Sequence, residues 1–224
     1  MMRRLIIAID GPSGAGKGTV ARAVAARLGY RHVDTGAMYR AVAWKALQQG
    51  LDPRDEANVA RIADSASFDL EQGRVRIDGH DVARAIRTPE IDAAAAAVAR
   101  HPAVRRALVA RQRLLGSGGG VVMEGRDIGT AVFPDADVKI YLDASPEERA
   151  RRRAADPAHA SSQGAQLTDV ATALAARDKS DSTRAVSPLA IAPDAVVIDT
   201  TGTDIDETVQ RVMEVVNWRL KTED

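Results

Sequence analysis

The chain has 224 residues, and its 31 basic and 31 acidic residues cancel, so no overall charge favours nucleic acid or a membrane surface as a partner. The absence of cysteine excludes disulfide and thiolate chemistry, and no apolar run is long enough for a membrane span or a signal peptide. We therefore expect a cytoplasmic protein with one substantial core and room for a small inserted lobe.

The first predicted elements are an apolar strand at residues 5–9, the sequence GPSGAGKGT at residues 11–19 and a helix after it. This order is typical of a phosphate-binding loop, because glycines let the backbone N–H groups turn inward at a helix N-terminus. Lys17 is expected in a solvated loop with its ammonium on the outer phosphates, and Thr19 offers a hydroxyl to phosphate or to its magnesium shell. Gly18 departs from the general pattern, which has Ser or Thr there. The predicted ATP-binding residues are Gly11, Pro12, Ser13, Gly14, Ala15, Gly16, Lys17, Gly18 and Thr19.

Further apolar runs of strand length occur at residues 121–123, 138–142 and 196–198, and residues 31–33 predict a short second strand. Helical patterns at 37–49 and 206–221 accompany them, and Trp44 and Trp218 are expected to pack within these helices. Continuous apolar strands separated by helices predict an α/β fold, a five-stranded parallel sheet with helices on both faces. Ligands of such sheets bind at the carboxyl ends of the strands, where the glycine-rich loop lies.

The alternation of apolar strands and helices is interrupted at residues 68–82 by short segments of alternating polarity joined by tight turns, which predict antiparallel strands. A helix begins near Pro89. We interpret residues 65–100 as an inserted lobe that binds the acceptor, which leaves residues 1–64 and 101–224 for the core. A second interruption begins at the helix-capping sequence Ser145-Pro146-Glu147-Glu148. An arginine-rich helix, a polar stretch at 156–166 and a helix at 170–176 follow. They predict a lid at about 150–170 or, alternatively, a solvated basic helix.

Four motifs in order carry a resemblance to a known family: the loop with glycine after its lysine, DTGAMYR at 34–40, EGRDIGT at 124–130 and RAVSPL at 184–189. The loop is similar to that of nucleoside monophosphate kinases, and the full set resembles the bacterial cytidylate kinases over about residues 5–220. The resemblance implies transfer of the γ-phosphoryl group of ATP, bound with Mg²⁺, to CMP and also to dCMP. It further implies a monomer that acts on these small molecules, with no nucleic-acid or membrane partner.

The resemblance also assigns roles to residues of this sequence. In catalysis it implies Lys17, Arg126, Arg184, Arg152 and Arg153, with Arg149 as a further lid candidate. In CMP binding it implies Thr35, Arg40, Arg105, Arg126, Asp127, Arg177, Asp181 and Arg184. Asp127 would accept a hydrogen bond from N4 of cytosine and Arg105 would donate to N3 and O2, whereas a hydroxyl residue that contacts the base in some members aligns with Ala96. No direct protein ligand to a metal is expected, and either Glu124 or Asp143 would hold magnesium through water.

Two other functions stay open at this point. The donor loop is shared with kinases for other small acceptors, such as another nucleoside monophosphate or shikimate. The loop also occurs in nucleotide-controlled regulatory switches, but a switch has no second anion to bind, so the acceptor-side arginines argue against it.

Overall fold

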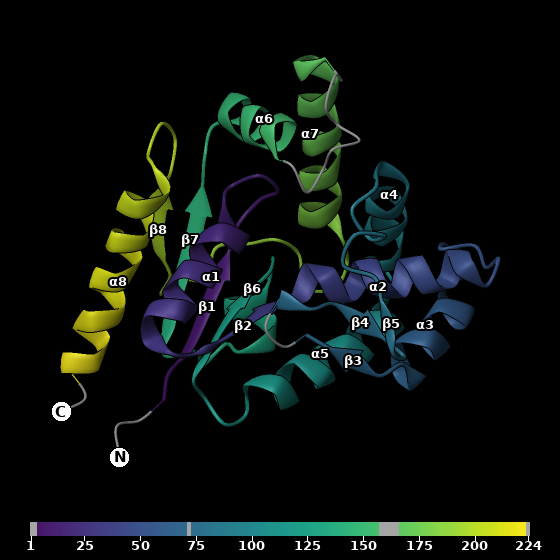
Figure 1. Cartoon of the computed structure of the whole chain (residues 1–224), viewed down its shortest axis with the longest axis horizontal. Helices are drawn as coiled ribbons and strands as arrows, with labels where there is room; N and C mark the ends of the chain where they lie inside the picture. The colour runs from purple at the N-terminus through teal and green to yellow at the C-terminus, as the bar shows by residue number, and fades with distance from the viewer. Residues whose placement is uncertain (1–3, 71–72, 157–165, 223–224) are drawn as a thin grey trace.

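The computed structural model describes residues 4–70, 73–156 and 166–222. Its central sheet has five parallel strands, as the apolar runs predict, in the order β2-β6-β1-β7-β8 (Figure 1). The strands are β2 (Arg31–Asp34), β6 (Val121–Glu124), β1 (Ile6–Asp10), β7 (Val138–Asp143) and β8 (Val196–Asp199). All five carboxyl ends therefore lie at one edge of the sheet, with β1 in the middle.

Helices cover both faces of this sheet because its three central strands, β1, β6 and β7, are buried on both sides. Ile7 and Ile9 of β1 pack into a core with α1 (Lys17–Leu28) and α8 (Ile205–Lys221). Ala8 points to the other face, where it packs with η2 (Ile128–Val132), a short π-helical turn, and with α5 (Pro102–Gly116). Each fully buried isoleucine contributes about 2 kcal/mol from the burial of its apolar surface.

A second, three-stranded antiparallel sheet forms where the alternating pattern at 68–82 predicts one. It belongs to a group of elements beside the main sheet (Figure 1): α2 (Thr35–Gln48), α3 (Glu56–Ser65), β3 (Phe68–Asp69), β4 (Arg76–Ile77), β5 (His80–Asp81) and α4 (Pro89–Val98). α3 is not among the predicted elements. Since α2, α3, α4 and α5 share one apolar cluster, the boundaries 65–100 of the inserted lobe stay a prediction.

Two helices stand over the carboxyl edge of the sheet, α6 (Pro146–Ala155) and α7 (Leu167–Thr183) (Figure 1). The predicted cap is present, because Glu148 donates its N–H to the Ser145 hydroxyl over 3.2 Å. α7 extends beyond the predicted 170–176 at both ends, and Ala150 of α6 packs against Val170 and Leu174 on it. Residues 157–165 of the predicted polar stretch lie outside the described residues.

The two tryptophans differ in their surroundings. Trp44 packs at the edge of the core of the small sheet, as expected. Trp218 is 64 % exposed on α8, so the expectation that it packs inside the helix layer is wrong. The face of α8 opposite to Val209, Val212 and Val216 has no neighbouring element to bury it in the described part of the chain. Among the described residues, no helix combines the length and apolar character needed to cross a membrane.

Candidate functional site

The carboxyl edge of the sheet borders a cavity of about 690 Å³. Eleven basic side chains and seven acidic ones line it among the described residues, so its surface suits polyanions. The predicted site residues at this cavity are Ser13, Gly14, Ala15, Gly16, Lys17, Gly18, Thr19, Thr35, Arg40, Arg105, Glu124, Arg126, Asp127, Arg152, Arg153, Arg177, Asp181 and Arg184. Gly11, Pro12, Ala96, Asp143 and Arg149 do not line it.

The glycine-rich loop has the backbone that the sequence predicts. Gly11 and Gly14 have φ angles of 147° and 82°, in the region that favours glycine. A Cβ on Gly11 would lie 2.0 Å from the carbonyl oxygen of Leu142, so the loop passes too close to β7 for any side chain. α1 begins at Lys17, and the free N–H groups of its first turn therefore belong to the loop.

Lys17 is buried and not solvated, contrary to the sequence-based expectation. Its side chain is only 6 % exposed, and its Nζ donates a hydrogen bond of 2.6 Å to the carbonyl oxygen of Pro12. Burial and the neighbouring Arg126 guanidinium lower the pKa of Lys17 to about 7. The loop thus wraps around its own lysine, and the negative charge of a bound polyphosphate would favour the charged form.

Glu124 explains why glycine follows the lysine. A Cβ on Gly18 would lie 3.1 Å from Oε1 of Glu124, which is closer than ordinary packing distance. The same oxygen lies 2.9 Å from Nε2 of His32 on β2. Glu124 therefore faces the phosphate-binding loop, whereas the rival Asp143 is exposed away from the cavity and its Oδ1 accepts the N–H of Ala144 over 2.8 Å.

Gly18→Ala is expected to lower kcat about tenfold, because the new methyl group displaces Glu124 by a few tenths of an ångström. The resemblance implies Mg²⁺ held through Glu124, so the concentration of Mg²⁺ at half-maximal rate is predicted to rise as well. Gly118→Ala is the control, since its Cβ would meet nothing within 4 Å. Unchanged rates and Mg²⁺ dependence for Gly18→Ala would show that Glu124 does not act at this position.

Asp127 holds two buried arginines together. It forms an ion pair with Arg105 and a 3.0 Å ion pair with Arg184, and Arg105 is only 1 % exposed. The Arg105 guanidinium also lies over the ring of Tyr39, 5.5 Å from its centroid. One carboxylate thus fixes two of the predicted acceptor-binding cations in position.

A second carboxylate, that of Asp181 on α7, holds a neighbouring group of arginines in position. Arg126 Nε lies 3.0 Å from Asp181 Oδ2, and both Arg177 and Arg184 approach this carboxylate to 3.7 Å. Asp34 at the start of α2 pairs with Arg40 at 2.9 Å. Burial alone would raise the pKa of Asp34, but Arg40 and Arg87 outweigh it and lower that pKa to about 2. Carboxylates therefore preorganise several cations of the cavity, and for Arg105 and Arg126 the carboxylate comes from another element.

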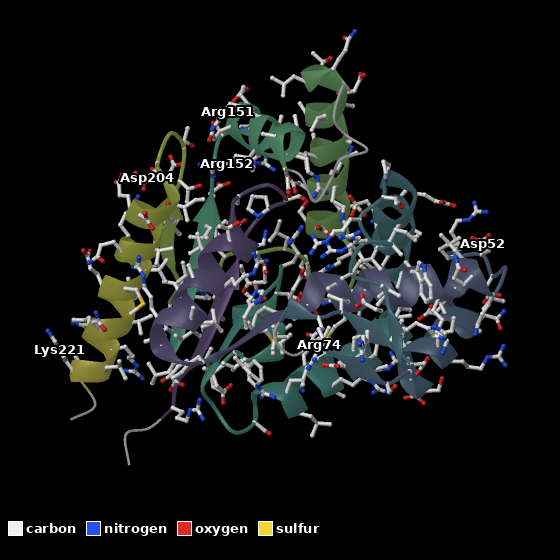
Figure 2. The ribbon with its side chains drawn as sticks, viewed as in Figure 1. Asp52, Arg74, Arg151, Arg152, Asp204 and Lys221 are labelled. Carbon is white, nitrogen blue, oxygen red and sulfur yellow. The ribbon has the colours of Figure 1, made fainter. Side chains whose placement is uncertain are left out.

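The lid candidates on α6 lie in three different environments. Arg149 pairs with Asp178 and donates to the carbonyl oxygen of Ser13 over 3.1 Å, so it holds the phosphate-binding loop from outside the cavity. Arg152 lines the cavity and donates to Thr200 Oγ1 over 2.8 Å, and Figure 2 shows it on the side of α6 that faces the sheet. Arg153 pairs with Asp92 of α4 at 2.9 Å.

Several residues at or near the site are absent from the sequence-based prediction. Arg87 lines the cavity 3.5 Å from Asp34, and Tyr39 lines it within the quoted motif DTGAMYR. Asp178 accepts the N–H of Ser13 over 3.1 Å. A second cavity of about 530 Å³ lies between α4 and α7, and Ala96, the position aligned with a base-contacting hydroxyl, faces that cavity.

Comparisons with known proteins identify the family of this chain. The family model described as cytidylate kinase matches residues 7–218. A cytidylate kinase from Geobacillus thermodenitrificans is 50 % identical over 98 % of this chain and 100 % of its own length. Another from Solibacter usitatus is 49 % identical over 97 % of this chain and 94 % of its own. A solved shikimate kinase from Bacteroides thetaiotaomicron shares the fold, with a TM-score of 0.51, 12 % identity and coverage of 95 % and 98 %. The chain belongs to the cytidylate kinase family.

Proposed function

We propose that this protein transfers the γ-phosphoryl group of ATP to CMP, and to dCMP, and so forms ADP and the cytidine diphosphate. The observation that carries the proposal is a single cavity with a lysine-bearing phosphate loop at one end and carboxylate-held arginines at the other. A phosphoryl donor and a phosphate acceptor need such separate cationic sites, because several negative charges must approach one another.

The proposed step is a direct displacement. An oxygen of the CMP phosphate forms a bond to the γ-phosphorus as the bond to the β,γ-bridging oxygen breaks, and ADP leaves with that electron pair. The attacking oxygen is already a nucleophile, so no general base is needed. Lys17 stabilises the donor phosphates, while Arg40, Arg126 and Arg184 bind the acceptor phosphate and Arg177 and Asp181 hold its ribose.

Magnesium fits the loop side of the cavity. The Glu124 carboxylate faces the loop beside Gly18, and carboxylate and hydroxyl oxygens suit this hard cation. We propose that Glu124, through water, and the Thr19 hydroxyl hold the ion together with the ATP phosphates. The described residues contain no group of three or more acidic or histidine side chains able to hold a metal, so ATP and water would supply most of its ligands. When bound, the ion neutralises charge on the transferring group.

Steady-state rates with ATP and each of CMP, dCMP, UMP, AMP and shikimate test this proposal. We expect the highest kcat/KM for CMP and dCMP. Faster turnover of AMP or shikimate would assign the protein to another acceptor, and no turnover with any acceptor would support a regulatory role.

Replacement of Arg152 or Arg153 by alanine is expected to lower kcat about a hundredfold for the arginine that meets the transferring group, with KM for CMP changed less than threefold. The reason is that charge develops there only in the transition state. Arg54→Ala is the control, because Arg54 does not line the cavity, its side chain is 83 % exposed and its partner is Asp52. A loss expressed only in KM would instead make these arginines ground-state binding groups.

A further inference from the structure

Asp10, the last residue of β1, lies between the donor loop and the acceptor site without lining the cavity. It is 5 % exposed, and both of its carboxylate oxygens accept backbone hydrogen bonds from one segment. Ile128 donates its N–H to Oδ1 over 2.8 Å, and Gly129 donates its N–H to Oδ2 over 2.7 Å. The two donors are the first residues of η2, directly after Asp127.

The N-terminus of η2 needs a partner for these N–H groups, because the first N–H groups of any helical turn have none inside it. Asp127 stands at the cap position, where an aspartate side chain ordinarily accepts such bonds. It makes no capping hydrogen bond, since its carboxylate is turned to Arg105 and Arg184. Asp10 supplies the cap from another strand.

We propose that Asp10 is a positioning residue for acceptor recognition, which caps η2 and thereby leaves the Asp127 carboxylate to its two arginines and to the acceptor base. The inference rests on the proposed function in one respect, the contact between Asp127 and the base. Asp10 immediately precedes the phosphate-binding loop and also accepts the two hydrogen bonds from η2. Its side chain therefore sets the distance between this loop and η2, the turn beside the predicted base-binding residue.

The charge state of Asp10 provides a specific test of this role. Burial raises the pKa of Asp10 to about 6, although the N–H groups of Gly129 and Ile128 oppose the rise. The charged groups that face it are Lys17 from α1 and Asp127, and Tyr141 of β7 also lies near. The alkyl part of Lys139 packs beside Gly129, while its ammonium pairs with Asp194. Protonation of Asp10 converts one acceptor oxygen into a donor, so one N–H of η2 loses its partner below about pH 6.

The first experiment compares Asp10→Asn with the wild-type protein and with Asp137→Asn. Asp137 is the matched control, because its Oδ2 accepts the N–H of Ile6 over 2.7 Å at the opposite end of β1. For Asp10→Asn we expect KM for CMP to rise about tenfold and the CMP/UMP ratio of kcat/KM to fall, with KM for ATP within twofold. Asp137→Asn should keep all three values near those of the wild type.

The pH dependence separates positioning from a merely structural role. The ratio of the KM values for CMP in Asp10→Asn and wild type should be largest near pH 7.5 and should shrink toward pH 5.5, because the wild-type protein then loses the same contact. Titration of the CMP phosphate affects both proteins equally and cancels in this ratio. A variant that loses only kcat or thermal stability, with unchanged KM for CMP and an unchanged CMP/UMP ratio, would overturn the proposal.

Hydrogen exchange of the Ile128 and Gly129 amides tests the cap in the wild-type protein without any substrate. After correction for the intrinsic rate, their protection should fall as the pH is lowered through about 6. Constant protection between pH 5 and 7.5 would show that Asp10 does not control η2, even if Asp10→Asn fails to fold. If the wild-type protein does not phosphorylate CMP, the proposed function fails, but this exchange experiment still decides the role of Asp10.

Discussion

Lys17→Ala is expected to lower kcat for phosphoryl transfer about a thousandfold while the protein stays folded. Lys17 is the cation that the phosphate-binding loop itself supplies, and no other lysine lines the described cavity. The fold should tolerate its loss, because burial lowers the pKa of Lys17 to about 7 and so the charged side chain costs stability at neutral pH. Initial rates with ATP and CMP, together with Tm, measure both effects.

Lys139→Met is the control for the loss of a buried lysine, and it is compared with Lys17→Met. Both lysines are buried, and each donates to the carbonyl oxygen of a proline five residues earlier, Pro12 for Lys17 and Pro134 for Lys139. Lys139 does not line the cavity, so its variant should keep activity within a few-fold. Lys17→Met, which keeps the side-chain stem, should be as inactive as Lys17→Ala. A folded Lys17→Met with near-wild-type kcat would remove the argument for a donor site at this loop.

Asp127→Asn is expected to lower kcat/KM for CMP about a hundredfold and to shrink the preference for CMP over UMP by at least about tenfold. The carboxylate accepts from two buried guanidinium groups, whereas an amide has one acceptor oxygen and a donor that opposes them. Its amide can also turn to meet either base. Breaking a buried ion pair should in addition lower Tm by about 5–15 °C.

The CMP/UMP ratio distinguishes recognition from general damage. Asp181→Asn is the control, because the Asp181 carboxylate is as buried as that of Asp127 and holds Arg126, but belongs to the predicted ribose and phosphate region. Asp181→Asn should lower kcat/KM for CMP and kcat/KM for UMP by the same factor. If Asp127→Asn keeps the wild-type CMP/UMP ratio, Asp127 only orients arginines and the base is read by other residues.

The main sheet follows from the sequence because its evidence is local. The apolar runs of β1, β6 and β7 are buried on both faces, and such runs have few alternatives to a parallel sheet. α3 escaped prediction although Val59, Ile62 and Ala63 have helical spacing, because its apolar face is short. Residues at positions 59–63 gain their burial from α2 and α5, which only the tertiary structure brings close.

The sequence predicts which residues lie at the cavity, but it does not predict which of them pair with one another. The motifs place nearly all of the expected residues at the cavity, since three of them lie at the carboxyl end of a strand and the fourth begins at the C-terminal end of α7. Which carboxylate holds which arginine depends on packing between segments distant in the chain, as in Arg126 with Asp181 or Arg149 with Asp178. The hydrophobic periodicity of the sequence gives no indication of such ion pairs. The burial of Lys17 and the cap formed by Asp10 could not be predicted from the sequence for the same reason.

The central position of β1 determines when this protein can fold during synthesis. Ile6 pairs in register with Val121, and Ile7 with Val138, so β1 has no partner in the main sheet until more than a hundred further residues have been synthesised. At 5–20 residues per second this delay is roughly 6–20 s. During this delay we expect the apolar strand to lack its sheet partners, and an unpaired apolar strand favours aggregation and binding by chaperones. The phosphate-binding loop directly follows β1, so we expect it to take its final form only after β6 and β7 have joined the sheet.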